Sequence, residues 1–237
     1  MTLSLVHAFV SGKADGGDTS LVRPSNWNAE HTITAAACSV LGRSANSSGA
    51  VADIAASADG QFLRRASGAL GFGAIAWSDL PDGLIIARSL TTYATNANVG
   101  TVSIPQDDTI PQSSEGTEIF NVNWTPKSTT NIVRVRAIIR GEVVIAYRAF
   151  AMALFKDSDA DCLVSSQGPQ IVTYDNQVFS PVPLEYEFVA GTTSTIALKL
   201  RVGTGDTNGL RLNGWNNGRI HGGKQLCTFM IEEIKAS

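Results

Sequence analysis

Few side chains in this 237-residue chain stand at spacings that suit metal binding. The run Asp157-Ser158-Asp159-Ala160-Asp161 suggests a calcium loop, because hard cations prefer several oxygen ligands on one turn. The full loop needs glycine at its sixth position and glutamate at its twelfth, where this chain has Cys162 and Gly168. A polar hairpin turn is therefore expected there, and no metal site is predicted.

Catalytic spacings are not recognisable either. His7, His31 and His221 are far apart, and none has a cysteine or glutamate at ligand spacing. The sequence has no nucleophile elbow and no glycine-rich phosphate loop. Glu185 and Glu187 share one strand face, which is more typical of a solvated face than of a glycosidase carboxylate pair. We therefore expect neither an enzyme nor a bound cofactor, and a depolymerase is the least favoured function.

One loop has residue types suited to binding a sugar: Trp215, Asn216, Asn217 and Arg219. A pyranose has an apolar face and a polar rim, so its recognition combines an aromatic face with planar amide and guanidinium groups. The alternative is a tight turn with Trp215 at a subunit interface, because Asn and Gly tolerate positive φ. A modest basic set is expected to pair with carboxylates of the domain or of another subunit rather than to bind an acidic glycan: Arg134, Arg136, Arg140 and Arg148.

The composition restricts the possible partners. The chain is 43% hydrophobic and only 16% charged, against ~25% in ordinary domains, and subunit contacts would account for so few surface charges. Its net charge is −3 without a basic block, and no apolar stretch reaches membrane-spanning length, so neither nucleic acid nor membrane insertion is expected. The N-terminus lacks the pattern of a standard secretory signal. Cys38, Cys162 and Cys227 are expected as buried free thiols, with an interchain disulfide left open.

Residues 84–237 have the density of a folded domain. Residues 132–137, 184–189 and 195–202 alternate with period two, residues 143–155 form a long apolar run fit for one central strand, and residues 225–234 form the last strand. Gly, Asn, Pro and Asp separate these segments. The pattern predicts an all-β sandwich, jelly-roll-like in type. A helix within residues 84–97 is an alternative without clear caps.

Residues 35–83 are rich in Ala, Gly and Ser and contain a weak repeat. Val40-Leu41-Gly42-Arg43 recurs as Phe62-Leu63-Arg64-Arg65, and Ser48-Gly49-Ala50-Val51 recurs as Ser67-Gly68-Ala69-Leu70. Such units cannot bury an apolar face alone, which leaves a disordered linker or an intertwined shaft made by several chains. Aromatic residues are scarce in disordered linkers and favour the shaft: Phe62, Phe72 and Trp77.

Residues 1–34 are too few to bury a core and must dock onto another surface. A short alternating strand near the N-terminus is followed by a turn-rich run, and Ser25 is suited to cap a helical turn. The run Pro24-Ser25-Asn26-Trp27-Asn28-Ala29-Glu30-His31 resembles the N-terminal segment of many tail-fibre-like proteins, where Pro-Ser-x-Trp-Asn-Ala-x-His is typical.

The rest of the chain shows the same resemblance. The middle region, with Gly60-Gln61-Phe62-Leu63, is similar to the linking modules of such fibres. Residues 106–128 are similar to the opening of a recurrent phage head domain, and residues 211–234 are similar to its end. The chain thus resembles the virion fibre proteins of tailed bacteriophages over nearly its whole length.

This resemblance implies a homotrimer on the phage particle, made in the bacterial host cytoplasm, with residues 1–34 as a virion anchor, 35–83 as a shaft and 84–237 as a head. The anchor would contact tail, neck or head proteins through residues that match the family pattern: Pro24, Trp27, Asn28 and His31. The preferred function is binding of a host-surface glycan by the head. The alternative is a neck, collar or head decoration fibre that stabilises the particle and binds no host ligand.

Overall fold

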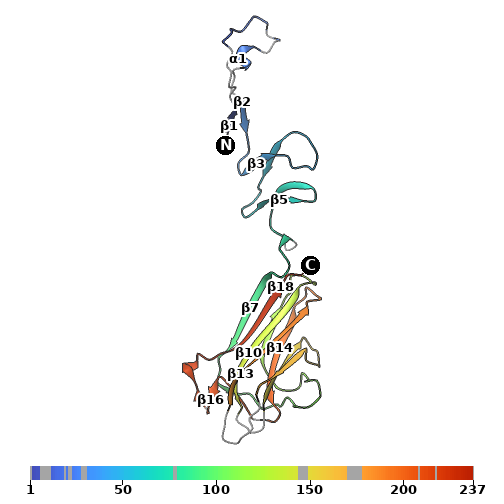
Figure 1. Cartoon of the computed structure of the whole chain (residues 1–237), viewed down its shortest axis with the longest axis vertical. Coiled ribbons are helices and arrows are strands. Elements are labelled where there is room, and N and C mark those ends of the chain that lie inside the picture. Colours follow the sequence, from blue (N-terminus) through green and yellow to red (C-terminus); the bar gives the residue numbers. More distant parts are fainter. Residues whose placement is uncertain are drawn as a thin grey trace. The chain divides into compact units, whose positions relative to one another are not determined.

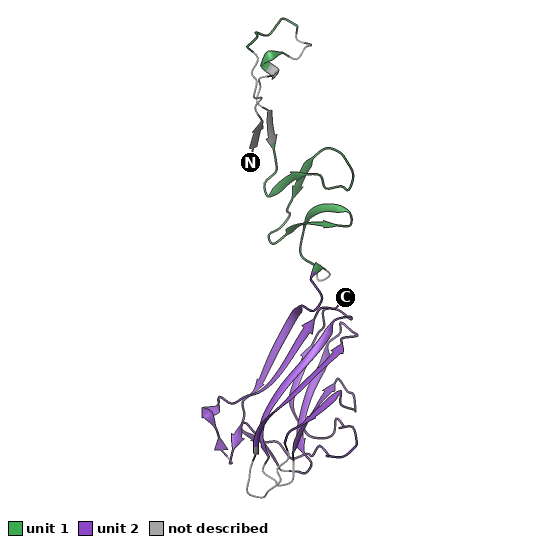
Figure 2. Cartoon of the chain, in the orientation of Figure 1, with its two compact units in different colours: residues 1–79 green, residues 80–237 purple. Residues whose placement is uncertain are grey.

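The computed structural model of the chain is nearly all β and divides into two compact units, Met1–Asp79 and Leu80–Ser237 (Figure 2). It describes residues 2–5, 12–18, 20, 23–27, 31–76, 79–143, 149–169, 178–207, 209–216 and 218–236. We describe each unit by itself. The division into anchor, shaft and head at residues 34/35 and 83/84 remains a prediction.

The described residues of unit 1 include three short antiparallel strand pairs and one helical turn. Strand β1 (Thr2–Leu5) pairs with β2 (His31–Thr34), β3 (Ser39–Gly42) with β4 (Ala52–Ala55), and β5 (Phe62–Ala66) with β6 (Ala69–Gly73). The two copies of the weak sequence repeat fall on the β3–β4 and β5–β6 hairpins. Among the unit 1 residues whose side chains are described, Ile54 alone is buried.

The helical turn α1 (Pro24–Trp27) is capped differently from the expectation. Ser25 does not cap it from the flank, because Ser25 lies inside the turn. The carboxylate of Asp15 accepts a hydrogen bond from the Ser25 backbone N–H at 2.9 Å and another from the Ser25 hydroxyl. These hydrogen bonds lower the pKa of Asp15, because they favour the ionised carboxylate. The capping group therefore comes from the turn-rich run that precedes the helix.

Unit 2 contains two large antiparallel sheets (Figure 1). The first sheet consists of β7 (Ile85–Tyr93), β8 (Ala97–Asn98), β10 (Ile132–Val143), β13 (Val178–Val189), β15 (Leu210–Leu212) and β18 (Cys227–Ile234). The second consists of β9 (Thr117–Trp124), β11 (Phe150–Lys156), β12 (Val164–Gln167) and β14 (Ile196–Thr204). Strand β10 is the centre of the first sheet, with β13 on one side and β18 followed by β15 on the other.

One hydrophobic core lies between the two sheets. Alternate residues of β10, Val133, Val135, Ala137 and Ile139, point into it, and their neighbours lie on the opposite face, which we call the outer face of the first sheet. Phe120 of the second sheet stacks on Phe229 of the first with ring centroids 5.3 Å apart. The prediction of an all-β sandwich is confirmed, because period-two alternation places one apolar face of each sheet against the other.

One local expectation was wrong, and the helix alternative is excluded. The apolar run of residues 143–155 is not one strand: Val143 ends β10 in the first sheet, and Phe150 begins β11 in the second. Hydrophobicity alone cannot show where a chain crosses between sheets. The second half of the apolar run does form an interior strand, because it belongs to β11, which is buried on both faces. Residues 85–93 form strand β7 rather than a helix, because they complete the sheet beside β18.

Strand β13 forms an edge of the first sheet that proline protects. Pro181 and Pro183 stand opposite Arg140 and Ile138 of β10 and cannot donate a backbone hydrogen bond to a further strand. In the part of the chain that the structure describes, no helix has the length and hydrophobicity to cross a membrane.

Candidate binding site

The loop singled out by its residue types forms a small hairpin at one end of unit 2. Strand β16 (Gly214–Trp215) pairs with β17 (Gly218–Arg219), and a short 3-10 turn, η2 (His221–Gly223), follows. Figure 1 shows this hairpin projecting from the sheet at the end of unit 2 away from the C-terminus. The chain enters unit 2 at the C-terminal end, where Gly83 donates a backbone hydrogen bond to Lys235. The hairpin thus lies far from residue 80 within this unit.

Asn213 fixes the base of the hairpin. Its side-chain Nδ2 donates to the carbonyl oxygens of Tyr93 at 2.8 Å and Thr95 at 3.2 Å, and its backbone N–H donates to Arg140 at 3.0 Å. Its φ of 53° is a left-handed conformation that asparagine tolerates better than most residues. Asn213 is 1% exposed, so it positions the hairpin rather than contacting a ligand.

Glu142 of β10 fixes the tip of the hairpin through a bond to its backbone. This glutamate of β10 is fully buried, and its Oε1 accepts a hydrogen bond from the Asn216 backbone N–H at 3.0 Å. Gly214 is needed at the neck, because an added Cβ would lie 2.5 Å from Asn96 Oδ1 and 2.7 Å from the Gly218 carbonyl oxygen. The hairpin is therefore held by contacts to β10 and to the segment after β7.

The predicted sugar-binding side chains lie on this anchored hairpin. Trp215 is 43% exposed, and Asn216 and Arg219 are exposed as well. Asn217 lies outside the described residues. Aromatic, amide and guanidinium groups on a hairpin whose backbone is anchored provide the stacking face and the hydrogen-bonding groups that a pyranose requires.

Cys227 supports the hairpin from the first sheet. Its Sγ accepts a hydrogen bond from the Arg140 backbone N–H at 3.3 Å, where β10 passes from its partner β18 to its partner β15. Its thiol also lies 3.4 Å from Asn213 Oδ1. Burial raises the pKa of the Cys227 thiol, because a thiolate loses hydration there. The expectation of buried thiols holds for Cys227, but Cys162 is half-buried and Cys38 is exposed.

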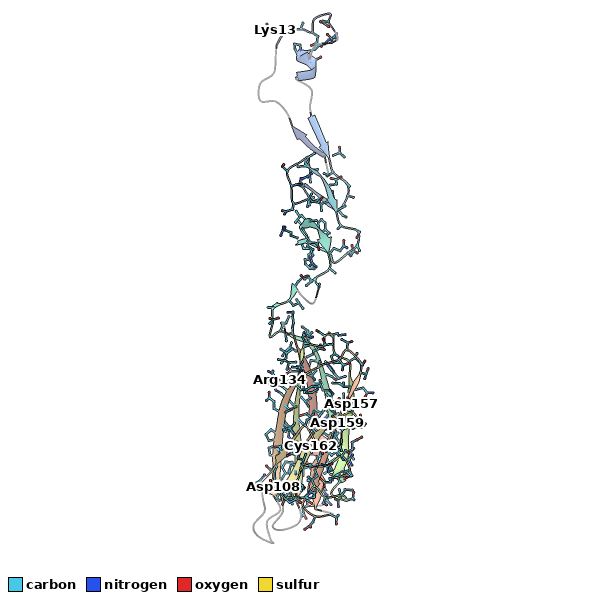
Figure 3. All side chains as sticks on the ribbon, turned by 90° about the vertical axis from the view of Figure 1, so that its right-hand side faces the viewer. Lys13, Asp108, Arg134, Asp157, Asp159 and Cys162 are labelled. Carbon is cyan, nitrogen blue, oxygen red and sulfur yellow. The ribbon has the colours of Figure 1, made fainter. Side chains whose placement is uncertain are left out.

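The basic residues of β10 behave as two groups. Arg134 (labelled in Figure 3) bonds to Glu187, and Arg136 Nε lies 3.0 Å from Glu185 Oε1, so these residues pair with the domain's own carboxylates as expected. The hydrogen bond to Glu187 raises the pKa of Arg134. Arg140 has a different environment, because Pro181 stands opposite it on β13. Arg148 lies outside the described residues.

The other predicted site residues are dispersed. Pro24 and Trp27 belong to α1 and His31 begins β2, whereas Asn28 lies outside the described residues. Asp157, labelled with Asp159 and Cys162 in Figure 3, has a φ of 52°, and its carboxylate accepts a hydrogen bond from the Ala197 backbone N–H. This run forms the turn that follows β11, with Asp157 bonded to the protein. Among the described residues, no cluster of three or more His, Cys, Asp or Glu side chains is arranged for a metal.

Sequence reasoning missed Glu142 and Asn213. The signals were modest: Glu142 is the one acidic residue between the basic positions of β10 and the apolar run, and Asn213 precedes a glycine. Neither signal identifies the partner, because the bonds that each residue makes link segments 74 and 120 residues apart.

Comparisons with known proteins do not assign a family. No protein-family model matches the chain, and no curated protein matches it. Among solved structures, the EclA C-terminal domain, a sugar-binding protein, is similar over 64% of this chain and 79% of its own length, with 16% identity and a TM-score of 0.28. Dimeric latent PorU from Porphyromonas gingivalis is similar over 64% of this chain, with 10% identity and a TM-score of 0.31.

VP2 of the infectious bursal disease virus subviral particle is similar over 71% of this chain, with 12% identity and a TM-score of 0.29. The matches span only 13% of the PorU chain and 40% of the VP2 chain. At these identities and TM-scores, the structural similarities do not indicate the function of this chain.

Proposed function

We propose that the chain is a non-enzymatic structural fibre of a tailed-bacteriophage particle, a homotrimer attached through its N-terminal segment and presenting unit 2 to a host-surface glycan. The phage assignment and the number three come from the sequence resemblance. The observation that carries the fibre proposal is the poor core of unit 1.

Unit 1 exposes the apolar residues that a folded unit would bury. Phe62 is 56% exposed and Leu63 is 45% exposed, both on the β5–β6 hairpin, and Val40 and Leu41 are exposed on β3. A single two-stranded hairpin is marginally stable at best in water, and ordering it costs about 1–2 kcal/mol for each backbone residue. Burial of these side chains against equivalent hairpins of other chains would offset that cost. An intertwined shaft is therefore the favoured assembly.

Unit 2 supports the binding role through its hairpin. The exposed Trp215, Asn216 and Arg219 stand on a hairpin anchored by Asn213 and Glu142, so little ordering is needed before a ligand binds. Three such sites on one particle protein would raise the effective affinity for a surface that carries many glycans. The location at the end of unit 2 away from residue 80 suits a surface that faces outward.

The first test is the mass in solution, measured by light scattering on the full chain and on a fragment that begins at Leu80. A trimer has a mass of about 75 kDa, three times the 25.0 kDa of the chain. A trimer for both proteins supports the fibre and assigns oligomerisation to unit 2. A trimer for the full chain alone assigns it to unit 1. A folded monomer in both cases refutes the fibre.

The second test separates a receptor-binding fibre from a decoration fibre. The trimer is applied to an array of host glycans, with Trp215→Ala as the matched variant. Binding that requires Trp215 supports the proposal. Absence of binding to glycans and to host cells, together with loss of particle integrity when the chain is deleted, favours the decoration fibre. Release of sugar from host polysaccharide would establish an enzyme instead.

A further inference from the structure

We propose that unit 2 has an anion-binding subsite beside the hairpin, a pocket that takes the carboxylate of an acidic pyranose such as a uronic acid. This inference rests on the proposed glycan-binding function and specifies the class of sugar. The pocket has a volume of about 530 Å³, within the ~300–1,000 Å³ that is usual for small-molecule sites.

The described titratable residues that line the pocket are all basic. Arg140 from the outer face of β10, His221 from η2 and Lys224 just after η2 line it, and none of the described residues that line it is acidic. This differs from the start of the same strand, where Arg134 and Arg136 are paired with glutamates. Three basic side chains around one cavity favour an anion, because each can donate a hydrogen bond to it.

These basic side chains keep their hydrogen-bonding capacity for a ligand. Arg140 Nη1 donates to the Leu226 carbonyl oxygen at 2.6 Å, which orients the guanidinium without neutralising it. Its neighbour across the ladder is Pro181, which offers no charge. Among the described residues, no carboxylate forms an ion pair with Arg140, His221 or Lys224. An anionic ligand would therefore supply the missing counter-charge.

An apolar wall completes the pocket. Phe179 and Leu226 line it together with the basic residues, and Thr228 adds a hydroxyl. A ring carbon face can pack on Phe179 while the carboxylate of the same sugar reaches the cations, because a uronic acid carries its charge at one edge of an apolar ring. A free inorganic anion would make no use of this wall.

The pocket adjoins the hairpin through the first sheet. Phe179 stands opposite Glu142 on β10, and Glu142 binds the backbone of Asn216 at the hairpin tip. Arg140 precedes Glu142 by two residues on the same face of β10, and His221 follows β17 closely. Trp215 and the pocket can therefore contact neighbouring residues of one oligosaccharide.

The test compares D-glucuronate with D-glucose by saturation-transfer NMR titration of the full-length protein. We expect glucuronate to bind about tenfold more tightly than glucose, because a charge-assisted hydrogen bond replaces a neutral one. The preference should vanish in Lys224→Gln and in Arg140→Gln. It should persist in the control Lys127→Gln, which removes one exposed cation away from the pocket. It should also weaken in 0.5 M NaCl.

Lys224 is exposed and no described hydrogen bond involves its side chain, so Lys224→Gln remains informative even where Arg140→Gln folds poorly. Equal binding of the two sugars, or a preference that neither pocket variant changes, overturns the anion-binding subsite. If neutral glycans still bind in a Trp215-dependent manner, the subsite is wrong and the proposed function stands. If no saccharide binds at all, both the subsite and the glycan-binding function are wrong.

Discussion

Replacement of Asn213 tests whether the candidate site is a preformed feature of the sandwich. Asn213→Gly removes the two hydrogen bonds that the side-chain amide donates to the carbonyl oxygens of Tyr93 and Thr95, at 2.8 and 3.2 Å, and the weak bond that its Oδ1 accepts from the Cys227 thiol at 3.4 Å. It retains the backbone N–H bond to Arg140 and permits the φ of 53°. Asn213→Ala removes the same side-chain bonds and also places a Cβ in a left-handed conformation that alanine adopts poorly.

The expected magnitudes follow from these contacts. At about 1 kcal/mol for each of the two amide hydrogen bonds, with little added by the weak thiol bond, Asn213→Gly should lower the free energy of unfolding by about 2 kcal/mol. Asn213→Ala should lower it by about 3 kcal/mol, because the left-handed conformation costs roughly 1 kcal/mol more. Asn216→Gly is the matched control, since Asn216 has a φ of 44° and an exposed side chain, and we expect a change within about 0.5 kcal/mol.

The assay is urea unfolding of the fragment that begins at Leu80, followed by the fluorescence of Trp124 and Trp215. This fragment corresponds to the unit that contains the sandwich core. A wild-type midpoint for Asn213→Gly would refute the anchoring role of the side chain. A higher stability for Asn213→Ala than for Asn213→Gly would refute the reasoning about φ.

Four further outcomes are expected. Ellman's reagent should label the exposed Cys38 rapidly, Cys162 slowly and Cys227 only on unfolding. Burial raises the pKa of the half-buried Cys162 thiol and of the buried Cys227 thiol. The stability that depends on the neutral Cys227 thiol should be complete below the ordinary thiol pKa and lost as the pH rises through the raised pKa, which urea midpoints between pH 7 and 10 would measure. Trp215→Ala should change the urea midpoint little, since the side chain is exposed, yet weaken glycan binding tenfold or more on the array. Phe62→Ser should shift the monomer–trimer equilibrium toward monomer in light scattering, at about 1.5–3 kcal/mol for each buried copy, without changing the unfolding of unit 2.

Several strands of unit 2 were readable from the sequence because they alternate between a buried and a more exposed face. Strand β10 alternates from Ile132 to Ile139, and this local pattern suffices to predict a strand with one buried face. The break within residues 143–155 was not readable. Both halves are apolar for different reasons, since Val143 ends a strand of one sheet and β11 is an interior strand of the other. Only the tertiary arrangement separates these two environments.

The residue types of the candidate site were predictable from the sequence, but the residues that anchor its hairpin were not. Trp215 and Arg219 are neighbours in sequence, so their combination was visible at once. Glu142 acts through a bond to Asn216, 74 residues away, and the pocket joins Arg140 to Lys224 across a comparable separation. Such pairings depend on the order of strands in the first sheet, which alternation does not encode.

The outer face of the first sheet carries two different surfaces. At its C-terminal end, a row of aliphatic side chains crosses the strands from Ile85 through Ile234 and Ile132 to Val189, and the two edge members are 46% and 62% exposed. Arg140 lies eight residues further along β10, a separation of roughly 26 Å for an extended strand. Between them, the ion pairs of Arg134 and Arg136 keep the face polar. A subunit contact centred on the aliphatic row would therefore bury apolar surface and leave the cationic pocket open. For this reason, the proposed assembly and the proposed sugar binding would use one face of one sheet without competing.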